Sequence, residues 1–220
     1  MAFGVRLQCW GDWACFTRPE MKVERVSYDA MTPSAARGVL EAIYWKPEIR
    51  WVIDRVTVLR PIRFTSIRRN EVKEKISAVA ASRVMNSGAG TLELIAPDGE
   101  MRQQRAAMLL RDVSYTIEAH FDIASGPDNI AKHLDQFQRR ARRGACYTRP
   151  YLGCREFPAH FALIEQDAAS PEIDESLKGE RDLGWILHDI DFAHGKQARF
   201  FRAIMRDGAI DVPPLSRARA

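Results

Sequence analysis

The feature that most constrains the fold is an unbroken alternation of apolar and polar side chains near the middle of the chain. It spans residues 113–121, VSYTIEAHF. Successive side chains of a β-strand point to opposite faces of a sheet, so this pattern is typical of a strand with one buried face. The predicted buried side chains are Val113, Tyr115, Ile117, Ala119 and Phe121, and those facing the other way are Ser114, Thr116, Glu118 and His120.

A helix is predicted directly after this strand, in residues 128–143, DNIAKHLDQFQRRARR. Asp128 is suited to cap its first turn, and two stripes with helical spacing run along opposite sides. The apolar stripe consists of Ile130, Leu134, Phe137 and Ala141, and the polar stripe consists of Lys132, Gln136, Arg139 and Arg143. His133 lies at the margin between the two stripes.

The N-terminal part shows two further strand patterns. Residues 3–10 alternate like a strand with one buried face, and we expect Gly11 and Asp12 to end it. Residues 51–69 form one long strand or two, because Pro61 disfavours a central strand at its position.

A second helix is predicted between these strands. Thr32 is a good N-cap, and Pro33 fits the first helical position. Pro47 stops the helix, which places Tyr44 and the rest of the IYWKP segment at its C-terminal end.

The C-terminal part is richer in strand patterns. Strands are predicted in REFPAHFALI and DLGWILHDIDF, and a helix or strand followed by an Asp-Gly turn in FFRAIMRDGAIDVPP. In the second of these, alternation sends His188 to the opposite face from Asp189 and Asp191, so a shared metal ion is not expected. No metal site and no cofactor are predicted, since the histidines and cysteines show no ligand spacing.

The order strand, helix, strand, loop, strand, helix, strand predicts an α+β protein. Its N-terminal part is expected to be a ferredoxin-like domain, the fold of RNA-recognition (RRM) modules, followed by a small β-rich C-terminal domain. Residues 1–125 would form the core, with a loop or hairpin inserted at about 71–100. Residues 126–144 would form the basic helix that completes the core, and residues 145–220 the β-rich region.

Composition adds little beyond this pattern. The formal net charge of +4 is compatible with a polyanionic partner without identifying one. No segment approaches the roughly 20 apolar residues needed to cross a bilayer, and the start of the chain lacks a signal-peptide core. The spacing of the four cysteines fits no CxxC pair. We therefore expect a cytoplasmic protein with no membrane partner.

Arginines cluster at the end of the second predicted helix and beyond it, with tyrosines between them. Guanidinium groups bind phosphates with two hydrogen bonds, and aromatic rings stack on unpaired bases. The cluster consists of Arg139, Arg140, Arg142, Arg143, Arg149 and Arg155, with Tyr147 and Tyr151. Further basic sets are Arg63, Arg68 and Arg69, and Arg102, Arg105 and Arg111. Solvated surface faces and a shared nucleic-acid groove both remain open.

Lys132 and His133 offer chemistry beside these arginines. His133 could transfer a proton and Lys132 could stabilise negative charge on a phosphate, as in a ribonuclease. The alternative is an ordinary helix-start lysine and a half-buried histidine. Tyr44 is likewise either a core aromatic or a group that orients a 2′-hydroxyl.

Several long segments together resemble one family. They are WGDWACFTRPEMKVERVSYDAMTPSAARGVLEAIYWKP, MRQQRAAMLLRDVSYTIEAHF, AKHLDQFQRRARRG and PYLGCREFPAHF. The chain is similar to the CRISPR-associated Cas five family of the type I-C (Dvulg) subtype, in the RAMP superfamily. The likeness runs from Val5 to about Val212 and is weak in residues 76–100.

The resemblance implies an endoribonuclease that cleaves precursor CRISPR RNA in each repeat. It implies further that the protein stays on the 5′ handle of the mature guide RNA. There it would join the type I-C Cascade complex, with Cascade backbone and large subunits and target DNA as partners in antiviral defence. The alternative is a non-catalytic subunit that caps the 5′ handle, and a weaker one is a general nucleic-acid-binding protein.

The resemblance also implies a catalytic set made of Tyr44, Lys132 and His133. The YLGCREF segment matches a glycine-containing loop near the RNA, where Gly153 would allow close approach and Arg155 would meet a phosphate. The expected reaction needs no metal: the RNA 2′-hydroxyl attacks the adjacent phosphate and leaves a 2′,3′-cyclic phosphate and a 5′-hydroxyl. The expected RNA-binding residues are Arg63, Arg68, Arg69, Arg105, Arg139, Arg140, Arg143, Gly153 and Arg155.

Overall fold

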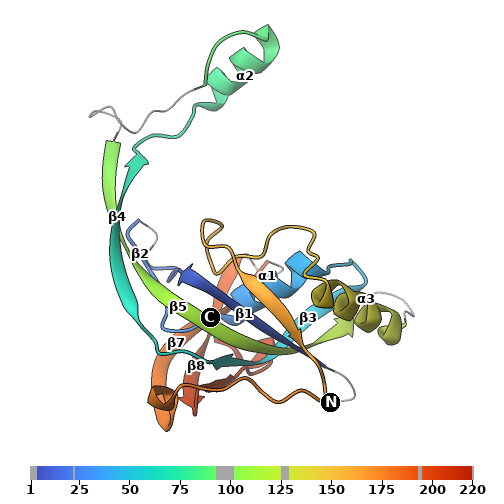
Figure 1. Cartoon of the computed structure of the whole chain (residues 1–220). Helices are drawn as coiled ribbons and strands as arrows, with labels where there is room; N and C mark the ends of the chain where they lie inside the picture. The colour runs from blue at the N-terminus through green and yellow to red at the C-terminus, as the bar shows by residue number, and fades with distance from the viewer. Residues whose placement is uncertain (1–3, 22, 93–101, 125–128, 193–194, 220) are drawn as a thin grey trace.

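The computed structural model describes residues 4–21, 23–92, 102–124, 129–192 and 195–219. It is an α+β structure with one large sheet and few helices (Figure 1). The elements are β1 (Val5–Ala14), β2 (Arg25–Val26), α1 (Pro33–Ile43), β3 (Ile49–Val58), β4 (Phe64–Val72), α2 (Ala78–Ser87), β5 (Arg102–Ile123), α3 (Ile130–Arg142), β6 (His160–Ile164), β7 (Glu180–Asp191), β8 (Gln197–Arg206) and β9 (Ala209–Asp211), with short 3₁₀ turns at Glu175–Leu177 and Leu215–Arg217.

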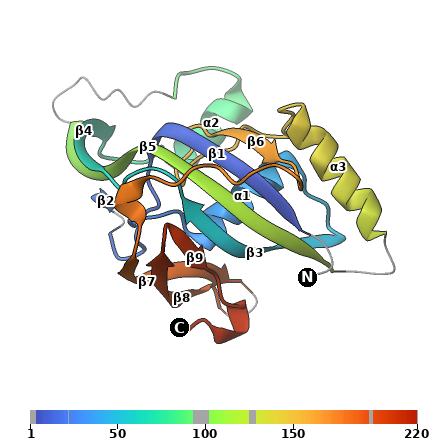
Figure 2. The same ribbon diagram turned by 60° about the horizontal axis from the view of Figure 1, so that its bottom comes forward.

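The strand order in the sheet is β6-β1-β5-β3-β9-β8-β7, and neighbours along this path are antiparallel. Strands β2 and β4 pair with β5 outside this path. Helices α1 and α3 pack beside each other on one face of the sheet, with α1 against β3 and β7 and α3 against β6 (Figure 2). The strand order therefore brings the two helices together, although almost a hundred residues separate them in the sequence.

The alternating segment lies in β5, at the centre of the sheet, and its predicted buried face is confirmed. Tyr115, Ile117 and Phe121 are at most 2% exposed. Ser114 and Thr116 on the opposite face are also buried, and the Gln8 amide donates a hydrogen bond to the Ser114 hydroxyl at 3.3 Å. Both faces of β5 are therefore buried between residues 113 and 117.

Strand β1 does not end at Gly11 and Asp12, so that prediction was wrong. It continues to Ala14, and Gly11 pairs with Val113 of β5. The reason lies in packing, because a Cβ atom at Gly11 would lie 2.8 Å from the Leu152 side chain. The glycine serves a close contact inside the sheet. The strand pattern around Pro61 does split in two, into β3 and β4.

A helix, α2, lies where the sequence predicted a loop or hairpin. Strand β4 pairs with residues 102–110 of β5. Ala107 and Met108 also pair with β2 and Leu110 with β1, and beyond them the two strands extend from the body toward α2 (Figure 1). We call β4, α2 and residues 102–110 the arm. Helix α2 has no buried residue, so no apolar stripe in the sequence marks it. Residues 93–101 of the predicted loop lie outside the described residues.

Strands β7, β8 and β9 form the C-terminal part of the sheet, and the predicted Asp-Gly turn connects β8 to β9. Asp207 and Gly208 both have positive φ, as such two-residue turns require. A bulge interrupts the pairing of β7 with β8 between Leu187 and Asp189. No helix within the described ranges is long and apolar enough to span a membrane.

Candidate active site

The C-terminal end of α1 positions Tyr44. Thr32 caps the start of α1 by accepting a hydrogen bond from the Ala35 amide at 3.2 Å, and Pro33 occupies the first turn, as predicted. At the other end Tyr44 has extended backbone angles, with φ −151° and ψ 118°. Its amide donates to the Leu40 carbonyl at 2.9 Å. The chain leaves the helix axis at Tyr44, and the tyrosine ring points toward α3.

The first turn of α3 positions His133. Asn129 caps this helix by accepting a hydrogen bond from the Ala131 amide at 2.9 Å, whereas the predicted cap, Asp128, lies outside the described residues. The buried face of α3 consists of His133, Phe137 and Ala141. Ile130, which was predicted to be buried, is 40% exposed. The buried stripe is thus rotated relative to the prediction and takes His133 from the margin into the core.

The structure brings Tyr44 and His133 into direct contact. The Tyr44 hydroxyl and His133 Nδ1 are 2.8 Å apart, although the residues come from different helices. Tyr44 is 5% exposed and His133 is 1% exposed, and the Phe121 ring packs edge-on against the imidazole. The phenol donates to Nδ1 when that nitrogen carries no proton and accepts from it when it does. The proton between the two residues can therefore lie on the Tyr44 oxygen or on His133 Nδ1.

Three hydrogen bonds fix the end of α1 that carries Tyr44. The Trp51 indole donates to the Tyr44 carbonyl at 2.9 Å, and Arg140 Nε of α3 donates to the Ile43 carbonyl at 2.7 Å. The Tyr147 amide donates to the Ala42 carbonyl at 2.7 Å. The last carbonyls of a helix have no partner within the helix, so these donors satisfy them and also connect α1 to α3. Sequence patterns gave no signal for the contribution of Trp51.

Lys132 lies on the exposed side of the same turn of α3 as His133. Adjacent helical side chains point about 100° apart, so the buried histidine and the exposed lysine face different surroundings. The structure therefore brings Tyr44 and His133 together and places Lys132, the neighbour of His133 in the sequence, on the surface.

The arginines of α3 have different surroundings. Arg139 and Arg143 are exposed, as expected for groups that bind phosphate. Arg140 instead holds the end of α1. Arg142 forms an ion pair with Glu165 at 2.7 Å and lowers the pKa of that carboxyl group. Only part of the predicted cluster is therefore exposed and outside the ion pairs among the described residues.

The predicted basic residues of the arm do not join those of α3. The arm contains the N-terminal part of β5, whereas α3 follows the C-terminal end of that strand (Figure 1). Arg68 is exposed, while Arg69 pairs with Glu156 at 2.5 Å and Arg105 with Glu71 at 3.6 Å. Arg63, just before the arm, is exposed. The structure thus separates the basic residues into two sets along β5.

The loop that contains Gly153 and Arg155 lies against the end of β1. Gly153 has φ +85°, and a Cβ atom there would lie 2.0 Å from the Cys15 carbonyl oxygen. The close approach that requires this glycine is therefore to the protein's own backbone. Arg155 is exposed.

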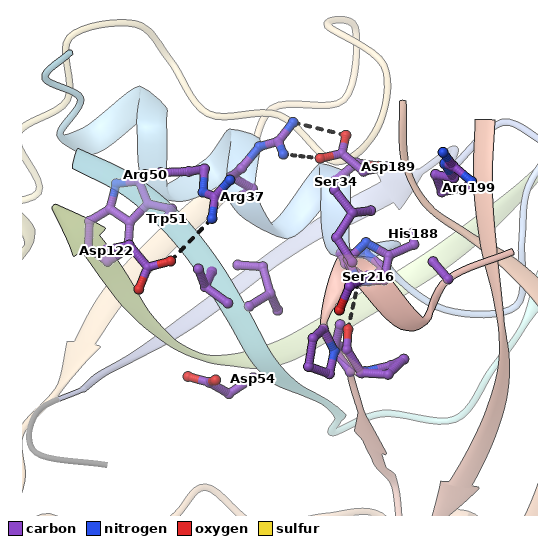
Figure 3. Close-up of a pocket in the computed structure, with 18 of the residues that line it drawn as sticks. Ser34, Arg37, Arg50, Trp51, Asp54, Asp122, His188, Asp189, Arg199 and Ser216 are labelled. Carbon is purple, nitrogen blue, oxygen red and sulfur yellow. Dashed lines mark hydrogen bonds and ion pairs between the residues drawn. The ribbon is translucent and has the colours of Figure 1, made fainter. Parts of the chain in front are cut away.

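A cavity of about 780 Å³ lies between α1, β3 and the C-terminal strands, apart from the Tyr44–His133 pair (Figure 3). His188, Asp189 and Asp191 all line it, because the bulge in β7 interrupts the alternation predicted to separate them. Asp189 forms two contacts with Arg37 of α1, one of them at 3.0 Å. Within the described ranges, no group of three or more His, Cys, Asp or Glu side chains is arranged to hold a metal ion.

Comparison with solved structures shows which fold the chain has. The fold matches a structure titled "Crystal Structure of CRISPR-associated Protein", with a TM-score of 0.72 at 21% identity over 99% of this chain and 95% of that one. It also matches a chain of a "CRISPR RNA-guided surveillance complex", with a TM-score of 0.54 at 17% identity over 96% and 91%. The chain thus has the fold of a CRISPR-associated protein.

Sequence comparison then gives the family. The Cas_Cas5d family, described as "CRISPR-associated protein (Cas_Cas5)", matches residues 4–213, and the chain belongs to this family. Two curated relatives are named "CRISPR pre-crRNA endoribonuclease Cas5d". The protein from Mannheimia succiniciproducens is 57% identical over 97% of this chain and 96% of its own length, and the protein from Thermus thermophilus is 38% identical over 95% and 91%.

Proposed function

We propose that this protein is a CRISPR RNA-processing endoribonuclease that cleaves precursor CRISPR RNA repeats. The observation that carries the proposal is the hydrogen bond between the Tyr44 hydroxyl and His133 Nδ1. It joins two residues that the family resemblance assigns to catalysis, in a chain that matches relatives named pre-crRNA endoribonucleases over nearly its full length.

In the proposed reaction the RNA 2′-hydroxyl attacks the adjacent phosphate. A phenol with a pKa near 10 is a poor base on its own, whereas an imidazole is suited to proton transfer near neutral pH. We infer that His133 is the group that transfers the proton and that Tyr44 orients the 2′-hydroxyl. The contact at Nδ1 couples these two roles. Lys132 on the exposed side of the helix stabilises the negative charge that develops on the phosphate.

The proposal includes the finer points of this chemistry. The products are a 2′,3′-cyclic phosphate and a 5′-hydroxyl, and the reaction needs no metal ion, because the nucleophile belongs to the RNA. A single 2′-deoxy nucleotide just upstream of the cut should block cleavage and leave binding unchanged. Cleavage of that substrate, or loss of activity in EDTA, would contradict the mechanism.

We propose that the protein then stays on the 5′ handle of the guide RNA as a cytoplasmic subunit of a type I-C Cascade. Its partners would be the backbone and large subunits, with target DNA in the assembled complex. Of the predicted RNA-binding residues, the exposed Arg139, Arg143 and Arg155 are best placed for phosphate, whereas Arg140 holds the end of α1 and Gly153 lies against the Cys15 backbone.

The ferredoxin-like assignment of the N-terminal domain also belongs to this proposal. It is supported by the order β1, α1, β3, β5, α3, β6 along the chain and β6-β1-β5-β3 across the sheet. We retain the division into a core at 1–125 with its insertion, a completing helix at 126–144 and a β-rich region at 145–220. Within that last region β6 pairs with β1, so it extends the core sheet.

One observation favours a second function. His133 is 1% exposed, which suits a protein that only caps the handle and uses Tyr44 and His133 to stabilise its core. In this alternative the protein binds repeat RNA without cutting it.

One experiment separates the two functions. Labelled repeat RNA is incubated in EDTA with the wild-type protein, with His133→Ala and with His160→Ala, whose exposed histidine lies outside the site. Cutting at one position by the wild type and His160→Ala but not by His133→Ala supports the endoribonuclease. RNA that is bound tightly and left uncut by all three proteins supports the capping subunit.

A further inference from the structure

The loop between α3 and β6 brings two cysteines together. Cys15 follows directly after β1, and its amide donates a hydrogen bond to the Leu152 carbonyl at 3.0 Å. Gly153 lies directly over the Cys15 carbonyl, because it has no side chain to keep the two backbones apart. The next residue is Cys154. Backbone contacts on both sides therefore hold Cys154 beside Cys15.

The two sulfur atoms share the same polar neighbour. The Thr17 hydroxyl lies 3.5 Å from Cys15 Sγ and 3.7 Å from Cys154 Sγ. Cys154 Sγ also lies 3.5 Å from the Cys15 carbonyl oxygen. The two thiols are also hydrogen-bonding partners of each other, so the side chains converge, as a disulfide requires.

The surroundings shift the pKa values of the two thiols in opposite directions. The Cys15 thiol, with help from Thr17 and Arg25, lowers the pKa of Cys154 to about 6, although burial acts in the opposite direction. The same contact and burial raise the pKa of Cys15. The contact therefore favours the thiolate form of Cys154, which is the nucleophilic form, over that of Cys15.

We propose that Cys15 and Cys154 form a redox-active dithiol that reacts with small disulfides of the glutathione type. Cys154 attacks one sulfur of the oxidant, forms a mixed disulfide and releases one thiol. The Cys15 thiol then loses its proton, attacks Cys154 and releases the second thiol. The protein loses two electrons and the proton of Cys15, and the oxidant is reduced to two thiol equivalents, one of which leaves as a thiolate and takes its proton from solvent.

The difference in exposure supports this order of attack. Cys154 is partly exposed, whereas Cys15 is buried. A small oxidant can therefore reach Cys154 first, and Cys15 acts from within. The resulting disulfide would join the loop that carries Arg155 covalently to the end of β1.

The test uses the full chain with glutathione disulfide as the probe. We expect the wild type to lose the mass of two hydrogens and to give a linked peptide containing Cys15 and Cys154. Cys15→Ser should stop at the mixed disulfide, with one glutathione on Cys154. Cys154→Ser should acquire no adduct at Cys15. Absence of both the linked peptide and the adduct on Cys154 would overturn the proposal.

Alkylation of the wild-type protein gives a second measurement, which needs no variant and therefore does not depend on whether a variant folds. Cys146 is the control, because it is also partly exposed but takes no part in this cluster. With a limiting amount of iodoacetamide, Cys154 should be modified first, and its rate should rise to half its maximum near pH 6. Equal modification of Cys146 and Cys154 at every pH would contradict a thiolate at Cys154. Neither measurement depends on RNA cleavage, so both test the dithiol separately from the proposed function.

Discussion

The hydrogen bond between Tyr44 and His133 determines where each of these two side chains can hold or accept a proton. Each is buried, and each is the hydrogen-bonding partner of the other. A substitution that removes the phenol hydroxyl but keeps the ring should preserve packing and disturb only the proton positions.

Tyr44→Phe should therefore slow RNA cleavage by about 10- to 100-fold and leave RNA affinity unchanged. A buried hydrogen bond that is left unmade costs about 1–3 kcal/mol. Single-turnover cleavage and a filter-binding isotherm measure the two quantities. Tyr147→Phe is the control: Tyr147 is 87% exposed, so this variant should cleave RNA at the wild-type rate. Equal cleavage rates for both variants would remove Tyr44 from the mechanism.

The role of Gly153 is a matter of backbone geometry. Gly153→Ala should destabilise the protein by roughly 2–4 kcal/mol, because its Cβ would collide with the Cys15 carbonyl and φ is +85°. The control is Gly38→Ala in α1, because an added Cβ there meets no atom within 4 Å. This substitution should stabilise the helix by about 0.5–1 kcal/mol. Urea unfolding measures both. If Gly153→Ala is as stable as the wild type, the backbone contact does not require glycine.

At the level of single residues, the family resemblance predicted a catalytic role for Tyr44 and His133, but no sequence pattern predicted the contacts that hold them in place. Trp51 and Arg140 act on carbonyls at the end of α1, and these contacts exist only once β3 and α3 pack around that end. A basic residue on a helix looks the same in the sequence whether its guanidinium binds RNA or a neighbouring helix. Closeness in the sequence therefore grouped Arg140 with the exposed arginines.

Elements with a buried face were the ones that the sequence predicted well. Caps and prolines located α1, and alternation located β5, because both signals follow from local geometry. Helix α2 was missed because it buries nothing within the described structure, so it lacks the stripe by which a helix is recognised. The continuation of β1 past Gly11 was missed because it depends on the distant Leu152.

The link between α1 and α3 gives a prediction at this scale. Arg140→Ala should lower kcat by about 10- to 100-fold with little change in KM, since small misplacements of reacting groups are costly. Arg139→Ala, on the exposed side of the same helix, should raise KM and reduce the salt dependence of binding by about one phosphate contact. Arg140→Lys should restore part of kcat, because an ammonium group can still reach the Ile43 carbonyl. If Arg140→Ala changes only KM, then Arg140 binds RNA and does not position Tyr44.

For the whole molecule, the pair between Arg37 and Asp189 joins α1 to the C-terminal strands. Asp189 is only 9% exposed, so removing its partner leaves a carboxylate poorly solvated. Arg37→Ala should lower the free energy of unfolding by about 1–3 kcal/mol, less than for a fully buried pair because the arginine is partly exposed. Arg206→Ala, which breaks an exposed pair with Glu180, should have almost no effect. Chemical denaturation gives the free energy of unfolding of both variants. Equal values for Arg37→Ala and Arg206→Ala would show that the Arg37–Asp189 pair contributes little to stability.

Strand β5 has a consequence for the synthesis of the protein. It pairs with β1, β2, β3 and β4, and Val5 finds its partner Ala119 more than a hundred residues later. At translation rates of roughly 5–20 residues per second, β1 leaves the ribosome on the order of ten seconds before the strand that completes it. Such distant pairing is slow to form and leaves strand edges open during that interval. We therefore expect refolding in milliseconds to seconds and a nascent chain that depends on chaperones until β5 has been made.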